Sequence, residues 1–242
     1  MDTPCRSDAT AAQPRRLAED LLLLLLDPAG GRPLTDSTRL DLALAGAVLV
    51  ELAEGGRVDV AGADAGWLYR GSLLALEGPA SGDEVLDGAW RLVRGKPGLR
   101  PASALNRLQR RLRPRLLERM AARGEVVART ELVLGLIPRT RWVPDAAVRA
   151  TLHARLSAVL VGAEPGSGRS GALLSLLHSV SLVPKVFAAT GLPRAELKRR
   201  AAALAEGDWA SEAVRRAVRD VQTATTAAMT ASVAAAATAA AS

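Results

Sequence analysis

The sequence is poor in the residues that form disulfides, metal sites and aromatic cores. It has one cysteine, Cys5, and two histidines, His153 and His178, among 242 residues. A single cysteine excludes an intramolecular disulfide, and one cysteine with two distant histidines does not make a zinc site. We therefore expect no metal, no cofactor, a reducing cytoplasmic location, and histidines that lie in or near the core.

Long apolar segments and aromatic residues are also scarce. The leucine run 21–26 is much shorter than the roughly 20 residues of a membrane-spanning helix, and the acids Glu19 and Asp20 before it do not fit a secretory signal. Only 2% of the residues are aromatic, so the core must be aliphatic. Leu and Ala favour helix, so the composition predicts a mainly α protein. We expect that it can touch a membrane but does not cross one.

Patterns that carry catalysis are absent or incomplete. Residues 162–170 resemble a phosphate-binding loop, but Ala163 occupies the first glycine position and Arg169 replaces the lysine. The segment Gly166-Ser167-Gly168 lacks the spacing of a nucleophile elbow. We assign no catalytic residue and expect a protein that is not an enzyme.

Positive charge, in contrast, is concentrated in one segment. Between Arg91 and Arg123 the chain has eleven lysines and arginines and one acid, Glu118, so this window exceeds the net charge of +7 of the whole chain. Surfaces made only for solubility mix the two signs. The segment therefore predicts a face for a polyanion, such as lipid headgroups or nucleic acid, with Arg119 among its contributors.

Periodicity predicts the elements in order. Helices are expected over 15–26, from a cap at Thr35 or Asp36 to Gly55, along the stripe from Leu105 to Met120, and over 145–161, 172–183, 193–205 and 209–221. Strands are expected at 57–60 and 126–127, and a β-hairpin over 131–143 around Pro138-Arg139. The result is a mainly α, compact single-domain helical fold with one or two β-hairpins. It occupies 15–222, between a flexible segment 1–14 and an Ala/Thr-rich tail 223–242 that is disordered or a frayed helix.

Several segments in order resemble the Golgi phosphoprotein 3 family. They are Leu17-Ala18-Glu19-Asp20 with the leucines that follow, 45–53 with Gly56-Arg57, Arg113-Pro114-Arg115-Leu116 leading to Arg123-Gly124, and 172–178. The resemblance implies a non-enzymatic adaptor and a basic pocket for the headgroup of phosphatidylinositol 4-phosphate. That pocket uses two basic residues of the later helix, which correspond here to Arg110 and Arg113.

The other half of the family pocket does not carry over. The family has a tryptophan where this chain has Asp36 and an arginine where it has Ala45, and Arg39, Trp67 or Arg70 are the candidate substitutes. Pro114 removes a helical hydrogen bond and predicts a kink between Arg110 and Arg113. The headgroup-binding residues that we predict are Arg107, Arg110, Arg111, Arg113 and Arg115.

The resemblance also implies a membrane-contacting or self-associating hairpin. Its apolar side chains here are Leu134, Leu136, Ile137 and Trp142, while Trp90 is expected in the core. The predicted function is peripheral binding to anionic membranes, with a homo-oligomer through the hairpin and protein clients left open. The target lipid is also open: a phosphoinositide, phosphatidylinositol, cardiolipin or phosphatidylglycerol.

A winged-helix nucleic-acid-binding protein is the alternative function. A basic helix followed by a two-stranded wing is the arrangement that such proteins use. Pro114 within that helix and the scarcity of base-reading side chains beyond Asn106 and Gln109 make it the weaker interpretation.

Overall fold

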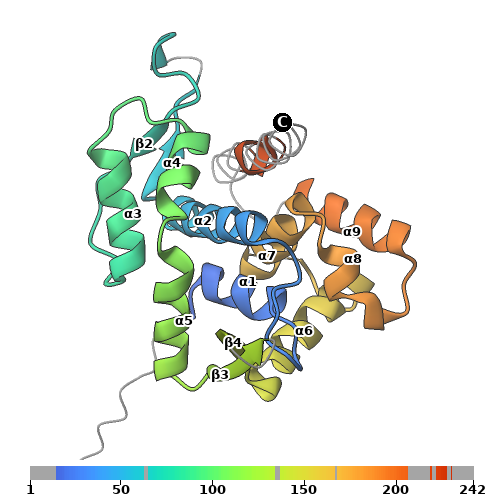
Figure 1. The fold of residues 1–242 in the computed structure, drawn as a ribbon. Coiled ribbons are helices and arrows are strands. Elements are labelled where there is room, and N and C mark those ends of the chain that lie inside the picture. The colour runs from blue at the N-terminus through green and yellow to red at the C-terminus, as the bar shows by residue number, and fades with distance from the viewer. Residues whose placement is uncertain are drawn as a thin grey trace, which may run out of the picture.

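The computed structural model describes residues 15–62, 65–133, 137–166, 168–206, 219, 222–227 and 230. Helices form most of this described chain, and its strands form two antiparallel hairpins (Figure 1). The helices are α1 (Leu17–Leu25), α2 (Ser37–Glu54), α3 (Glu84–Arg94), α4 (Pro101–Leu108), α5 (Leu112–Ala122), α6 (Ala146–Val161), α7 (Gly168–Ser179), α8 (Val183–Val186) and α9 (Arg194–Glu206), with a 3-10 turn at Ala188–Thr190. The strands are β1 (Val58–Val60), β2 (Leu73–Ala75), β3 (Val126–Val133) and β4 (Ile137–Pro144). The predicted mainly α fold with β-hairpins is confirmed.

Helix α1 lies at the centre of the fold, with α2, α5, α6 and α7 around it (Figure 1). Every residue of α1 is buried, and α7 is buried from Ser170 to Leu177. Each leucine buried in this way contributes about 1.5–3 kcal/mol relative to an exposed one. The helix predicted over 172–183 is confirmed as a buried element, although it begins earlier, at Gly168, and ends at Ser179.

Helix α2 begins and ends where the sequence predicts. The Asp36 carboxylate accepts the Arg39 N–H at 2.9 Å and thereby caps the helix. The chain leaves the helix at Gly55, and Gly56 has a φ of +63°. The apolar face of α2 is buried against α1, so the loop between these two helices is held at both ends.

The basic segment is two helices rather than the single stripe that the sequence predicts. The break falls at 109–111, where Arg111 has the left-handed φ of +59°. Pro114 is the third residue of α5, where the missing N–H has no helical acceptor to lose. The chain therefore changes direction between Arg110 and Arg113, as expected, but it does so before the proline rather than at it.

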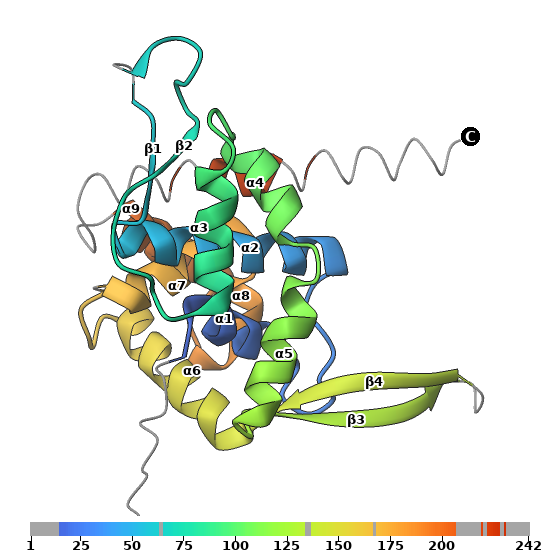
Figure 2. The same ribbon diagram turned by 90° about the vertical axis from the view of Figure 1, so that its left-hand side faces the viewer.

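The hairpin β3–β4 is longer than predicted and projects from the body of the molecule (Figure 2). The segment at 126–127 and the first half of the predicted hairpin form one strand, and Thr130 pairs with Thr140. Pro138 lies within β4 opposite Leu132 and not in the connection. Leu134 and Leu136 lie outside the described residues, as does the side chain of Ile137, whose backbone pairs with Val133.

The two ends of the chain are described only in part. The segment 1–14 and most of the helix expected over 209–221 lie outside the described residues. Residues 222–227 are helical, Thr225 is buried, and Ala224 packs on the core. The Gln222 amide also donates a hydrogen bond to Ser175 on α7. The start of the Ala/Thr-rich tail therefore contacts the domain.

A close backbone approach holds the β3–β4 hairpin on the α1–α2 loop. Gly31 has a φ of +63°, and a Cβ on it would lie 2.6 Å from the carbonyl carbon of Trp142. The turn before it is closed by the Gly31 N–H, which donates to the Asp27 carbonyl at 3.0 Å. Only glycine combines this backbone conformation with this approach.

We expect Gly31→Ala to destabilise the fold more than Gly56→Ala. Both glycines have a φ of +63°, but the space around Gly56 is open. The control therefore carries only the left-handed backbone cost of about 1 kcal/mol. Gly31→Ala adds the clash with Trp142, about 1–3 kcal/mol more. Urea unfolding measures both values, and equal losses would refute the close approach.

Candidate functional site

Two carboxylates that contact the basic segment are buried in the protein interior. Glu19 on α1 and Asp83 at the start of α3 are 0% and 2% exposed. Arg119 on α5 binds both, with its Nε 2.7 Å from Glu19 Oε1 and its Nη1 2.5 Å from Asp83 Oδ2. An unpaired buried charge costs several kcal/mol, so Arg119 ties α1, α3 and α5 together.

Two more arginines complete this group. Arg16 Nε lies 2.9 Å from Asp83 Oδ2. Arg123 Nη2 lies 2.6 Å from Glu19 Oε1 and 2.9 Å from Glu125 Oε2. We call Arg16, Glu19, Asp83, Arg119 and Arg123 the buried ion-pair cluster.

The cluster keeps Asp83 ionised in spite of its burial. Burial alone raises the pKa of this carboxyl, but the hydrogen bond from the Leu86 N–H and the charges of Arg119 and Arg16 outweigh it. The net effect holds the pKa of Asp83 below its ordinary value. A lowered folded-state pKa adds stability above the unfolded-state pKa and loses it as the pH falls through the folded-state value. Asp83 is therefore ionised at neutral pH.

A second set of ion pairs continues from the cluster along α1. The Asp20 carboxylate lies 2.8 Å from both Arg15 Nε and Arg169 Nε. Glu51 on α2 accepts the Leu17 N–H at 2.7 Å. Arg169 is the residue of the apparent phosphate loop, and here it holds α7 on α1. Its role in this structure is a structural ion pair.

Arg119 and Arg123 are thus not free to bind an external anion. Arg119, which we expected on the anion-binding face, has its guanidinium on two carboxylates. The exposed arginines of α4, α5 and the break between them are Arg107, Arg110, Arg111 and Arg115. Within the described part of the chain none of these four has an ion pair or a side-chain hydrogen bond. They lie along α4 and α5, which follow one another on one side of the molecule (Figure 2).

Arg113 is about as exposed as Arg119 and Arg123, but the carboxylate that it pairs with is not fully buried. Its Nε is 3.2 Å from Asp41 Oδ1, and the two side chains are 27% and 23% exposed. Burial raises the pKa of Asp41, and the charge of Arg113 offsets this rise only in part. The pair is therefore a weakly stabilised one at the protein surface.

A surface cavity opens beside Arg113. It has a volume of about 330 Å³ and lies between the α1–α2 loop, the start of α5 and strand β4. Its lining residues are Leu26, Gly31, Pro33, Ser37, Arg113, Pro114, Leu117, Glu118, Arg139, Thr140, Arg141 and Trp142. We call this the hairpin cavity.

The hairpin cavity combines cations with hydrogen-bond donors and one indole ring. Arg113, Arg139 and Arg141 supply three guanidinium groups, and Glu118 is the one acid among the lining residues. Arg141 is also paired across the hairpin with Glu131. Arg139 is exposed and forms no ion pair with the described residues. Planar guanidinium groups suit bidentate contacts to phosphate and carboxylate, so this lining suits a small anionic group.

The predicted site residues divide between different places. Arg113 and Trp142 line the hairpin cavity. Arg115 lines a separate cavity of about 530 Å³ at the start of α3, where Arg119 and Glu84 are its neighbours. Arg107, Arg110 and Arg111 line neither cavity and lie on the exposed surface of α4 and the break after it.

The missing half of the family pocket has a structural explanation. Asp36 is the cap of α2, and Ala45 is fully buried in the core, where an arginine has no room. The candidate substitutes Arg39, Trp67 and Arg70 do not line the hairpin cavity. Trp142 on β4 lines the hairpin cavity together with Arg113.

Sequence reasoning did not predict that Arg139 and Arg141 line the same cavity as Arg113. These two arginines alternate with Thr140 and Trp142 in β4, and this alternation is the signal that could have drawn attention to them. It does not reveal which helix β4 lies beside. That depends on the close approach at Gly31, which only the folded chain shows.

The described residues contain no group of three side chains suited to holding a metal ion. Among them there is also no helix whose length and hydropathy would let it cross a bilayer. His153 stacks on Phe187, with ring centroids 4.9 Å apart, and its Nε2 lies 3.0 Å from the Val186 carbonyl oxygen. This agrees with the predicted partly buried histidine. Trp90, which we expected in the core, is half-buried against it, between the guanidinium groups of Arg57 and Arg94.

Fold and cavity together define a mainly helical domain with an arginine-lined surface site beside a β-hairpin. A family model described as Golgi phosphoprotein 3 (GPP34) matches residues 17–221. The chain belongs to the Golgi phosphoprotein 3 family, a family of non-enzymatic, adaptor-type proteins. No curated protein matches the chain.

We expect Arg119→Met to lower the free energy of unfolding by about 3 kcal/mol, because it leaves two buried carboxylates short of a partner. The matched control is Arg115→Met, one turn earlier on the same helix and exposed. It should change stability by no more than about 0.5 kcal/mol. Urea unfolding at neutral pH gives both values. Similar losses in the two variants would contradict the structural role of the cluster.

Proposed function

We propose that this protein binds anionic membrane surfaces peripherally, as a non-enzymatic adaptor, and takes a lipid headgroup into the hairpin cavity. The observation that carries the proposal is the convergence of Arg113, Arg139 and Arg141 on one open cavity. A volume of about 330 Å³ falls within the roughly 300–1,000 Å³ of small-molecule sites. Membership of the Golgi phosphoprotein 3 family supports the same function.

The exposed arginines outside the cavity supply the long-range attraction. Arg107, Arg110, Arg111 and Arg115 have no neutralising partner among the described residues. Each basic residue near an anionic membrane contributes about 1 kcal/mol to binding, and salt weakens this contribution. The exposed arginines would bring the protein to the surface, and the cavity would then hold one headgroup.

The β4 strand gives the cavity an apolar side. Trp142 packs partly on the core and lines the cavity, where the indole ring offers an amphipathic surface for the headgroup region. The rest of the hairpin, with Leu134, Leu136 and Ile137, remains our candidate for apolar membrane contact or self-association. Protein clients of such an adaptor would bind elsewhere.

The proposal is tested by sedimentation of the full chain with vesicles. The vesicles contain phosphatidylcholine alone, or with phosphatidylglycerol, cardiolipin or phosphatidylinositol 4-phosphate, at low and high salt. Salt-sensitive binding to the anionic vesicles that a short DNA duplex does not displace would support the proposal. Tight binding to DNA with no binding to vesicles would make the basic segment a nucleic-acid surface and refute it.

We expect Arg110→Ala with Arg113→Ala to weaken binding to anionic vesicles by about tenfold, since two cations are lost. The control is Arg194→Ala with Lys198→Ala, which removes the same net charge from exposed positions on α9. It should change binding much less. Circular dichroism checks that both variants stay helical. Equal weakening by the two pairs would mean that only net charge matters.

We expect Asp41→Asn to strengthen binding to the same vesicles by a few-fold. The change removes the negative charge 3.2 Å from Arg113 and leaves that arginine free for the headgroup. The control is Glu164→Gln, which removes an exposed acid that follows α6 and does not line the hairpin cavity. A gain in both variants would reflect net charge, and no gain in Asp41→Asn would separate Arg113 from the site.

A further inference from the structure

Three consecutive large apolar side chains of the described chain are exposed outside the β3–β4 hairpin. They are Trp67, Leu68 and Tyr69, which are 82%, 62% and 46% exposed. They follow one another in the turn between β1 and β2. This turn projects at the end of the α4–α5 pair opposite β3–β4 (Figures 1 and 2). We call residues 65–71 the aromatic tip.

The backbone of the aromatic tip forms a closed turn that keeps the three apolar side chains on its outside. Gly66 and Gly71 have φ values of +74° and +75°, which reverse the chain on either side of the three apolar residues. The Gly71 N–H donates to the Ala61 carbonyl at 2.9 Å, and the Arg70 N–H donates to Gly66 at 3.1 Å. These bonds close the turn and leave the side chains outside it.

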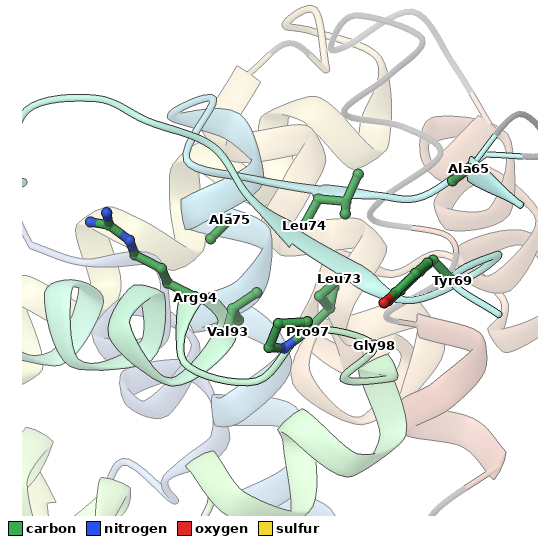
Figure 3. Close-up of a pocket in the computed structure, with 9 residues that line it drawn as sticks. All are labelled: Ala65, Tyr69, Leu73, Leu74, Ala75, Val93, Arg94, Pro97 and Gly98. Carbon is green, nitrogen blue, oxygen red and sulfur yellow. The ribbon is translucent and has the colours of Figure 1, made fainter.

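The apolar surface continues from the tip down to the body of the protein. A cavity of about 440 Å³ lies below the tip, between β2 and the end of α3. Tyr69, Leu73 and Leu74 line it on the side of β2, and Val93 and Pro97 line it on the side of α3 (Figure 3). Leu74 and Leu76 are each 39% exposed, so an apolar strip joins the tip to the domain.

Two unpaired cations stand beside this strip. Lys96 and Arg100 lie in the α3–α4 loop, which the Leu73 N–H holds against β2 by donating to the Leu99 carbonyl at 2.7 Å. Both are exposed, and neither forms an ion pair with the residues that the structure describes. The stretches 65–76 and 95–100 contain no acid. Of the acids next to them, Glu77 is paired with Arg94 at 3.3 Å, and Asp59 lies across from Leu74 on β1.

We infer that the aromatic tip is a second membrane contact, which inserts Trp67 and Leu68 into the interfacial zone of an anionic bilayer. This rests on the proposed membrane function and adds to it a contact independent of the hairpin cavity. Tryptophan and tyrosine favour the level of the lipid headgroups. Lys96 and Arg100 lie where anionic headgroups would meet the strip, and no acid on these stretches opposes them. A convex apolar tip with a cationic base fits a deformable lipid surface.

The test compares full-length variants in sedimentation with vesicles of phosphatidylcholine and phosphatidylglycerol. Trp67→Ala with Leu68→Ala should weaken binding by about tenfold, because binding scales with the apolar area buried in the bilayer. The control is Val161→Ala, which trims an exposed apolar residue 45% accessible at the end of α6 and should leave binding unchanged.

A spectroscopic measurement locates the tip directly. Lipids with brominated acyl chains quench tryptophan fluorescence on contact. Trp67→Phe keeps an aromatic ring at the tip, so it should retain most of the binding and lose most of the quenching. Unchanged quenching in this variant, or unchanged binding in the Trp67→Ala, Leu68→Ala variant, would overturn the inference. Self-association of the wild type that this double variant abolishes, without a change in vesicle binding, would assign the tip to a second copy and also overturn it.

Different variants distinguish the aromatic tip from the hairpin cavity as the membrane contact. If only the tip acts, binding depends on Trp67 and Leu68 and is insensitive to Arg110→Ala with Arg113→Ala. If only the hairpin cavity acts, the sensitivities are reversed. Absence of binding to every vesicle would refute both.

Discussion

Arg119 lies between two buried carboxylates that belong to helices far apart in the sequence, Glu19 on α1 and Asp83 at the cap of α3. Burying charge is tolerated only when each partner is matched, so the ends of α1, α3 and α5 must meet in one arrangement. The leucines of α1 supply most of the apolar burial around this point, but apolar contacts alone do not choose a direction. The ion pairs orient α1 within its shell of helices.

The position of α5 then determines the candidate site. Because Arg119 and Arg123 hold the second half of α5 on the core, its first turn reaches α2 just after the α1–α2 loop, where Arg113 meets Asp41. The same loop receives β4 through the close approach at Gly31. The hairpin cavity is thus formed by three elements that the cluster and one glycine bring together. The exposed arginines of α4 and the aromatic tip belong to neither the cluster nor the hairpin cavity. The core does not depend on the surfaces where they lie.

Sequence reasoning worked best where the deciding interaction is local. The sequence placed the cap of α2 at Thr35 or Asp36, and the partner of Asp36, the Arg39 N–H, is only three residues away. The glycines after α2 end it for equally local reasons. The hairpin was predicted from two extended stretches around Pro138-Arg139, and the buried helix α7 from its uniform hydrophobicity. The single basic helix was wrong because a leucine stripe can continue in register across a break, and the left-handed Arg111 leaves no mark in such a pattern.

Only part of the candidate site could be predicted from the sequence. Arg115 and Arg119 lie one turn apart on α5 and look alike in sequence, yet one is exposed and the other is bound to carboxylates 100 and 36 residues away. By itself the sequence determined the helical class, most element positions and the concentration of positive charge, because propensity, capping and charge count depend on neighbouring residues. The tertiary structure alone decided which arginines are neutralised, which indole lines a cavity with Arg113, and that Trp67 is exposed. Burial and ion pairing are properties of distant segments, and they exist only once the chain has brought those segments together.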